Sequence, residues 1–194
     1  MSAAPALVLG STSRHRAALL QRLGLPFSRV APQVDEAALA DETPAACAQR
    51  LARAKALEVA SRHPGCVVIG SDQVADCAGR MLGKPGSVEA ACRQLREFSA
   101  RAVDFHTALC VVGPQGGIGE ALDATRVVFR ELDDAGIERY VAHDQPLDCA
   151  GSFRCEGLGI ALFERIDSQD PTALVGLPLI ALCALLRPFG YRLP

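Results

Sequence analysis

Apolar strand-type segments alternate with helix-type segments along this sequence, and the pattern predicts an α/β domain of the mixed α+β kind. Residues 7–9 and 67–69 are short, wholly apolar runs typical of buried strands. Thr43-Pro44 combines a capping hydroxyl with a proline suited to the first turn of a helix. Residues 103–112 and 125–129 are β-rich, with a glycine-rich turn between them that indicates antiparallel pairing as well. A twisted mixed sheet flanked by helices would accommodate all these segments.

The first third of the chain is expected to supply one strand and two helices. After the strand at residues 7–9, Ser11-Thr12-Ser13 leads into a helix with leucines on one face, which ends at Gly24. The helix that begins at Thr43-Pro44 should run to about Arg62.

The rest of the chain continues the alternation. The strand at residues 67–69 should end at Gly70-Ser71-Asp72. The later elements are expected as a helix at residues 87–99, β-stretches at 103–112 and 125–129, a helix near 133–143, a strand near 160–164 and a helix near 177–186.

Length and charge limit the class of protein. The 194 residues are 49% hydrophobic and 22% charged, which suits one globular domain over residues 1–194 and excludes a disordered chain. The formal net charge of −2 offers no broad basic field. We therefore expect neither a nucleic acid nor a membrane as partner.

Three features favour a cytoplasmic protein. Residues 1–5 lack the basic and apolar segments of a signal peptide. The longest apolar run, residues 174–186, is too short to span a bilayer and is interrupted by Gly176 and Pro178. The eight cysteines form no C-x-x-C pair and no zinc-ligand spacing, so we expect free thiols in a reducing compartment.

Lysine is rare in this chain. Lys55 and Lys84 are the only lysines among 20 basic residues. A compact ammonium could matter at both positions, although chance in an arginine-rich composition explains the count equally well. Lys55 lies four residues after Leu51 beside an apolar helix face, and Lys84 is held in the turn Gly83-Lys84-Pro85. Both could also be ordinary surface lysines.

The segment Ser11-Thr12-Ser13-Arg14-His15-Arg16 is a candidate anion site, because it lies between a buried strand and a helix start. Unpaired N–H groups at a helix N-terminus favour an anion, and the serine hydroxyls and Arg16 add donors. A helix cap with solvated arginines would explain the same residues. The sequence contains neither a P-loop nor a dinucleotide-binding glycine fingerprint.

Asp35-Glu36 and Asp72 are the candidate metal ligands. Asp72 follows a buried strand, at the end of a sheet where ligands commonly bind. Converging carboxylates would suit Mg²⁺ together with substrate phosphate, whereas a turn cap and a surface loop are the alternative. Together with the lysines, Arg16 and the serines, these residues match the parts of a metal–polyphosphate site.

Six short motifs in one order resemble the Maf family of nucleoside triphosphate pyrophosphatases over nearly the whole chain. They are Leu9-Gly10-Ser11-Thr12-Ser13, Val34-Asp35-Glu36, Arg50-Leu51-Ala52-Arg53-Ala54-Lys55-Ala56, Ile69-Gly70-Ser71-Asp72-Gln73, Gly83-Lys84-Pro85 and Val175-Gly176-Leu177-Pro178. The resemblance implies a two-lobed Maf/Ham1-like fold around a central cleft, a homodimer, and a divalent metal, Mg²⁺ or Mn²⁺. It also implies cleavage of a nucleoside triphosphate between the α and β phosphorus atoms, giving a monophosphate and pyrophosphate.

The resemblance also implies roles for the matching residues. Asp72 matches the family's catalytic proton acceptor and a metal ligand, and Glu36 matches a second metal partner. Lys55 and Lys84 match catalytic cations that stabilise the leaving pyrophosphate. The triphosphate-binding set comprises these lysines with Ser11, Ser13 and Arg16.

Three positions that would face the base indicate the subgroup. Gln73 and Glu156 resemble the subgroup that acts on 7-methyl-GTP, whereas the dTTP/UTP subgroup usually has threonine and glutamine there. A carboxylate at Glu156 can accept from guanine N–H donors, and a cationic methylated ring favours negative charge nearby. At His15 the 7-methyl-GTP subgroup commonly has tryptophan, and histidine offers a smaller stacking surface. Arg14 and Ala17 replace the family's usual proline and second arginine.

The expected activity is hydrolysis of 7-methyl-GTP to 7-methyl-GMP and pyrophosphate, which would remove modified nucleotides from the pool. Two alternatives stay open. One is a dTTP/UTP-type pyrophosphatase of the same family. The other is a non-catalytic nucleotide-binding regulator, since Maf-like proteins are linked to inhibition of septum formation, although pure binding would not need Asp72 near a metal.

Overall fold

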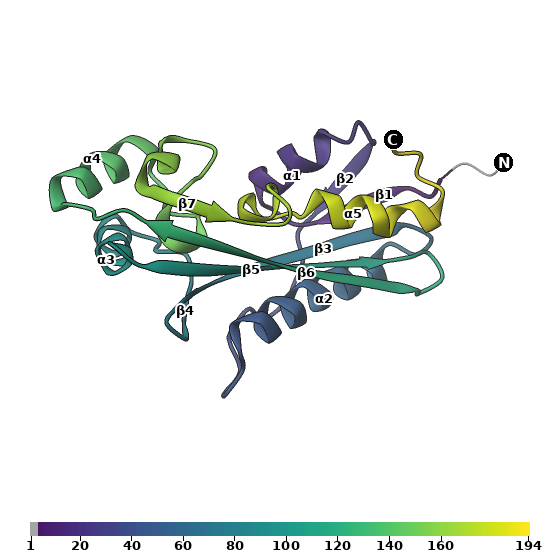
Figure 1. Ribbon diagram of the computed structural model, residues 1–194. Coiled ribbons are helices and arrows are strands. Elements are labelled where there is room, and N and C mark those ends of the chain that lie inside the picture. Colours follow the sequence, from purple (N-terminus) through teal and green to yellow (C-terminus); the bar gives the residue numbers. More distant parts are fainter. Residues whose placement is uncertain (1–3) are drawn as a thin grey trace.

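In the computed structural model, which describes residues 4–194, one mixed β-sheet runs through the whole molecule (Figure 1). The strands are β1 (Leu7–Gly10), β2 (Phe27–Val30), β3 (Val67–Cys77), β4 (Arg80–Leu82), β5 (Ala102–Val112), β6 (Ile118–Phe129) and β7 (Phe163–Asp167). The α-helices are α1 (Arg14–Gln21), α2 (Pro44–Arg62), α3 (Val88–Phe98), α4 (Asp134–Asp144) and α5 (Leu179–Leu186). The prediction about a signal peptide concerned residues 1–5, and residues 1–3 of that segment lie outside the described residues.

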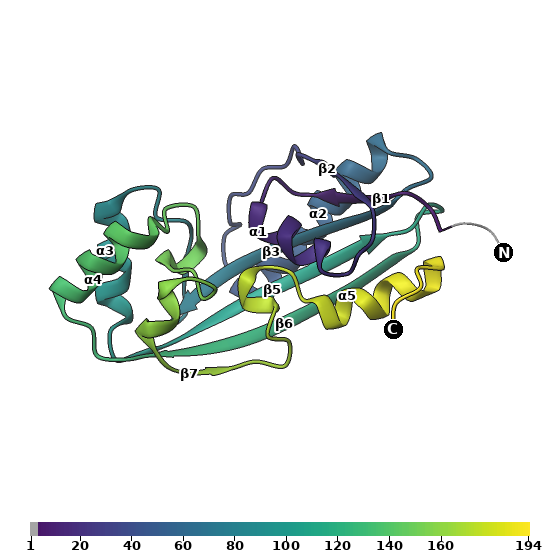
Figure 2. The ribbon, with the colours of Figure 1, turned by 90° about the horizontal axis from the view of Figure 1, so that it is seen from above.

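The sheet combines parallel and antiparallel pairing, as the mixed fold class predicts. Its order is β2-β1-β3-β5-β6-β7, and β4 also pairs with β3. β1 is parallel to β2 and β3, whereas β3, β5, β6 and β7 pair antiparallel. Figure 2 shows the long strands β3, β5 and β6 passing between two groups of helices, α3 and α4 at one end and α1, α2 and α5 at the other. We call these ends the second and the first lobe.

The first lobe has cores on both faces of the sheet, because side chains alternate along a strand. On β5, Leu109 and Val111 pack in a cluster with Leu182 of α5. The intervening Cys110 packs with Ala48 of α2. Accordingly, α2 covers one face of the sheet, while α1 and α5 lie on the other (Figure 1).

The second lobe is built around phenylalanines. Phe105 and Phe129 come from the long strands, Phe98 ends α3, and Phe153 and Phe163 come from the segment after α4. Their ring centroids lie 4.8–5.7 Å apart in tilted and edge-to-face pairs, the geometry that aromatic quadrupoles favour. This aromatic core attaches the segment at residues 145–157 to the sheet.

The helix starts follow their capping residues, whereas several strand limits differ from expectation. Thr43 and Ser87 cap α2 and α3 as predicted. The prediction that the second strand ends at residues 70–72 is wrong, because β3 pairs with β5 as far as Asp76. The strand near residues 160–164 is also displaced: residues 158–162 form a 3₁₀ helix, and β7 begins at Phe163.

Two strands were not predicted from the sequence, and both are short. β2 carries an exposed pair in its middle, Ser28 and Arg29, and β4 has three residues. Within residues 4–194, the helices are all too short or too polar to cross a bilayer. The eight cysteines are free thiols.

Candidate active site

A cleft of about 950 Å³ lies between the two lobes. Its walls are residues 10–16 of the first lobe and the segments at 81–84 and 145–156 of the second. The ten residues predicted to form the site all line this cleft: Ser11, Ser13, His15, Arg16, Glu36, Lys55, Asp72, Gln73, Lys84 and Glu156. The structure therefore brings together side chains that the sequence spreads over 146 positions, from 11 to 156.

The cleft forms where β3 has an open edge. β5 pairs with one edge of β3 from Val68 to Asp76. Along the other edge, β1 pairs only over residues 67–69 and β4 only over residues 75–77. Residues 70–74 lie in the gap between those two ladders. Asp72 thus lies in the middle of a strand rather than after its end.

The cleft floor, as we call Lys55, Asp72 and Glu36, is centred on one ammonium group. Lys55 Nζ lies 2.6 Å from Asp72 Oδ1 and 2.7 Å from Glu36 Oε1. Lys55 is 5% exposed and Asp72 is 7% exposed, whereas Glu36 is open to solvent. A buried ammonium is stable only when paired, so Lys55 requires these carboxylates. In turn it holds both of them around one point.

Gly70 allows α2 to lie directly against β3. A Cβ atom at residue 70 would lie 2.3 Å from the carbonyl oxygen of Ala52 and 2.6 Å from the backbone nitrogen of Ala56. No side chain fits at those distances. This close approach brings Lys55 of α2 to Asp72 of β3.

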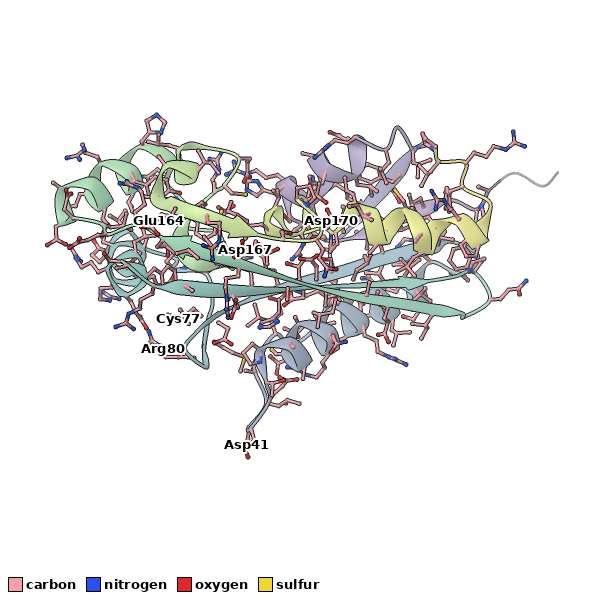
Figure 3. The ribbon with its side chains drawn as sticks, viewed as in Figure 1. Asp41, Cys77, Arg80, Glu164, Asp167 and Asp170 are labelled. Atoms are coloured by element: carbon pink, nitrogen blue, oxygen red, sulfur yellow. The ribbon has the colours of Figure 1, made fainter. Side chains whose placement is uncertain are left out.

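Glu36 reaches the floor from the long segment between β2 and α2. Arg50 of α2 holds this segment: its Nε and Nη2 donate to the Glu42 carboxylate at 2.6 and 2.8 Å, and Nη2 donates to the Ala37 carbonyl at 3.0 Å. Asp41 lies at the tip of the segment, away from the sheet (Figure 3). Asp35 does not join the site, because it is exposed and its Oδ1 accepts from the backbone nitrogen of Ala37.

The charges around Glu36 favour its ionised form. Partial burial raises its pKa, but the hydrogen bond and charge of Lys55, with the charges of Lys84 and Arg16, more than compensate, so the pKa of Glu36 lies below its ordinary value. Lys84 exerts this effect from the second lobe, where it is an exposed residue of the cleft wall after β4. Both lobes therefore contribute cations to one carboxylate.

The start of α1 presents donors to the same cleft. Ser13 caps the helix by accepting from the backbone nitrogen of Arg16, and Ser11 Oγ accepts from the backbone nitrogen of Ser13 at 3.1 Å. Because both hydroxyls act as acceptors inside the protein, their hydrogens remain available to a ligand. The same serines can therefore cap the helix and still donate hydrogen bonds to an anion.

Arg16 is fixed by the motif near the C-terminal end of the chain. Its Nε donates to the carbonyl of Gly176 at 2.9 Å, and that oxygen also accepts from Ser71 Oγ at 2.9 Å. Burial lowers the pKa of Arg16, while the charges of Asp72 and Glu36 oppose this shift. Arg16 therefore lies within electrostatic range of both floor carboxylates.

At the other end of the cleft, His15 and Glu156 form what we call the base-end wall. His15 Nδ1 lies 2.7 Å from Glu156 Oε1, and both side chains are partly exposed. Gln73 also lines the cleft, but its amide nitrogen already donates to Thr107 Oγ1 and to the carbonyls of Ala173 and Leu174, at 2.9–3.1 Å. Gln73 therefore holds the 173–175 turn against the sheet.

Three residues that support the site were not predicted from the sequence: Arg50, Ser71 and Thr107. Arg50 and Ser71 stand inside two of the six motifs, and that placement was the available signal. Thr107 gave no signal, since its contact with Gln73 depends on the register between β5 and β3.

Comparisons with known proteins give the family of the chain. Residues 6–189 match the family model described as Maf-like protein. The chain is 56% identical over 190 residues to a protein from Xanthomonas campestris pv. campestris (strain 8004) named 7-methyl-GTP pyrophosphatase, covering 98% of this chain and 99% of that one. A protein of the same name from Bordetella avium (strain 197N) is 53% identical over 187 residues, covering 96% and 94%.

A solved structure shares the fold at low sequence identity. The Staphylococcus aureus Ham1 protein superposes with a TM-score of 0.52 at 16% identity, covering 94% of this chain and 98% of that chain. The match of the family model to nearly the whole chain, together with the identity to these relatives, shows that the chain belongs to the Maf family.

Proposed function

We propose that this protein hydrolyses 7-methyl-GTP to 7-methyl-GMP and pyrophosphate and thereby removes a modified nucleotide from the pool. The relatives that carry the name 7-methyl-GTP pyrophosphatase are 53–56% identical over nearly the full length. One observation carries the proposal: the paired carboxylates of the floor and the acidic base-end wall line a single cleft. A triphosphate at the floor can therefore place its base against Glu156.

Asp72 is the proton acceptor in this proposal. The oxygen of a water molecule attacks the α phosphorus, the bond from that phosphorus to the bridging oxygen breaks, and pyrophosphate leaves with the bonding electrons. Asp72 takes the proton released by the water. Its burial excludes competing solvent, and Lys55 neutralises its charge at 2.6 Å.

The remaining cations and donors bind the triphosphate. Lys55 and Lys84 face the leaving pyrophosphate from opposite lobes, where fixed positive charge stabilises the negative charge that develops. Arg16 and the hydroxyls of Ser11 and Ser13 hold the phosphate oxygens at the start of α1.

Glu36 and Asp72 would hold a divalent cation, Mg²⁺ or Mn²⁺. The donor set fits: two carboxylates reach one point, and Mg²⁺ is commonly bound by one or two carboxylates with waters and substrate phosphates. When bound, the ion would supply charge neutralisation at the phosphoryl oxygens. Lys55 keeps the same two carboxylates in place.

Base recognition rests on Glu156, His15 and Gln73. Glu156 accepts from the N–H donors of guanine, and its charge favours a cationic, methylated ring. His15 provides a flat surface beside it. Gln73 acts by fixing the 173–175 turn next to the base, with its amide oxygen as the group left for a ligand.

A panel of nucleotides tests the activity. We expect pyrophosphate release with Mg²⁺ or Mn²⁺ to be fastest for 7-methyl-GTP in a set that also holds GTP, dTTP, UTP and CTP. A preference for dTTP or UTP would instead place the chain in the other subgroup of the family. Binding without release from any nucleotide would indicate the regulatory alternative. We further propose that the protein acts in the cytoplasm as a homodimer. Light scattering of the purified chain would test the dimer.

A further inference from the structure

A cluster of metal-ligating side chains lies at the base-end wall, apart from the floor carboxylates. One ring nitrogen of His15, a carboxylate oxygen of Asp148 and Cys149 Sγ all lie within 4.8 Å of one another. His15 belongs to α1 of the first lobe, while Asp148 and Cys149 belong to the 145–157 segment of the second. The ligand atoms therefore meet across the cleft. For this reason no metal-ligand spacing in the sequence indicates the cluster.

Glu156 prepares His15 for coordination. A proton on His15 Nδ1 satisfies Glu156 Oε1 at 2.7 Å, and it leaves the lone pair on Nε2. Arg14 Nε donates to that nitrogen at 3.4 Å, a long and exposed contact that a bound cation would displace. Metal-binding histidines commonly donate their other N–H to a carboxylate in this manner, which fixes the tautomer and makes the ligating nitrogen more basic. The His15–Glu156 pair has this arrangement.

We propose that His15, Asp148 and Cys149 form a site for a thiophilic divalent cation, with Zn²⁺ as the representative ion. Imidazole, carboxylate and thiolate are the three ligand types that zinc prefers, and a site with three protein ligands keeps a fourth position open. Ligand atoms bound to one tetrahedral zinc at about 2.0–2.3 Å lie about 3.3–3.8 Å apart, so the three side chains must move together by up to about 1.5 Å when the ion binds. Mg²⁺ prefers oxygen ligands and is not suited to this set.

A bound cation would have to displace the neighbouring Arg14 side chain and the thiol proton of Cys149. Arg14 lies 3.9 Å from Asp148, but it is a solvent-exposed side chain that can swing away. Burial, with help from Asp148 and Glu156, raises the pKa of Cys149 to about 12, although Arg154 opposes this. Cys149 is thus a thiol in the metal-free protein. Zinc forms the Zn–S bond as the S–H bond breaks, and the proton passes to solvent.

Occupation of this site would interfere with nucleotide binding, and this consequence rests on the proposed function. The cation would fix His15 and draw the 145–157 segment toward α1 at the place assigned to the base. Zinc would therefore compete with 7-methyl-GTP, while Mg²⁺ at the floor would not.

Metal titration of the full chain tests the site without reference to catalysis. We expect the metal-free protein to take one equivalent of Zn²⁺ from a chromophoric chelator, with Mg²⁺ in excess unable to replace it. Co²⁺ at the same site should produce a sulfur-to-cobalt charge-transfer absorption. Failure to bind Zn²⁺, or a cobalt complex without this absorption, would overturn the proposal.

Matched cysteine variants identify the ligand. Cys149→Ser should abolish the charge-transfer absorption and weaken Zn²⁺ binding at least about tenfold, since even the loss of an outer-shell partner costs 10–100-fold. Cys155→Ser alters another half-buried thiol of the same segment and should change neither measurement. If the absorption persists in Cys149→Ser or disappears in Cys155→Ser, the assignment is wrong. Asp148→Asn is a second variant. Because Asp148 is exposed, this substitution should weaken Zn²⁺ binding without disturbing the fold.

The consequence for the nucleotide is tested separately. Addition of 7-methyl-GTP should weaken Zn²⁺ binding to the native protein, and Zn²⁺ should inhibit pyrophosphate release by the native protein more strongly than by Cys149→Ser. Tight Zn²⁺ binding that 7-methyl-GTP does not weaken would overturn the competition and leave the metal site standing. If the protein releases no pyrophosphate, the proposed function fails while the titrations still decide the site.

Discussion

The cleft floor and the base-end wall face the same cleft but are built in different ways. On the floor, Asp72 lies within a long strand and Lys55 within a long helix, and both are buried. At the wall, Glu156 belongs to an irregular segment and is partly exposed. Packing of regular elements fixes the floor, whereas a few polar contacts hold the wall. Substitutions should therefore affect turnover and stability at the floor and base selectivity at the wall.

The largest effect is expected from Asp72→Asn, which tests the floor directly. The variant keeps the shape of the side chain but removes the proton acceptor, so pyrophosphate release should fall by at least about 100-fold, within the range for loss of a general base. Folding should be preserved, because the asparagine oxygen can still accept from Lys55 and Lys55 keeps its ion pair with Glu36. Release assays and thermal melts check the two parts. Near-normal turnover would remove Asp72 from its proposed role.

Gly70→Ala should damage the floor without changing any charged residue. The added methyl group would overlap the α2 backbone and push it from β3, at a cost of about 1–3 kcal/mol of unfolding free energy. The movement would also withdraw Lys55 from Asp72 and lower the rate. Gly117→Ala is the matched control, since a Cβ there meets no atom within 4 Å. Equal melting temperatures and rates for the two variants would contradict this view of the helix–strand contact.

The two lysines should differ in their tolerance of arginine. Lys55→Arg should lose nearly all activity, because a planar guanidinium cannot replace a compact ammonium held between two carboxylates in a buried space. Lys84→Arg should also be costly but less so, since Lys84 is exposed on the wall and the longer group can adjust. Values of kcat/KM measure the order. Arg53→Lys, on the exposed side of α2, is the control for an exchange between these two residue types. A larger loss for Lys84→Arg than for Lys55→Arg would show that burial does not set the requirement for lysine.

Much of the floor was predictable from the sequence. Thr43 and Ser87 mark helix starts through local capping chemistry, which depends on neighbouring residues alone. The six motifs identified Asp72, Lys55, Lys84 and Glu36 as site candidates, and the structure brings all of them to one cleft.

What could not be predicted depends on contacts between distant residues. The continuation of β3 through Asp72 follows from pairing with β5, and a polar Ser71-Asp72-Gln73 run gives no strand signal by itself. Gln73 was expected at the base, but its amide nitrogen is bound to the 173–175 turn, 100 residues away in sequence. The contact of His15 with Glu156 likewise depends on how the two lobes meet.

The smallest effect is expected at the wall, from His15→Trp. Tryptophan offers a larger stacking surface and a stronger cation–π partner for a methylated, cationic base, an interaction of about 0.5–2 kcal/mol. The ratio of kcat/KM for 7-methyl-GTP to that for GTP should therefore rise about 2- to 30-fold, while kcat changes little because the floor is untouched. Glu156→Gln should move the same ratio downward, since it removes the negative charge beside the base. If His15→Trp lowered kcat and left the ratio unchanged, the wall would be part of the catalytic geometry, and the division between floor and wall would not hold.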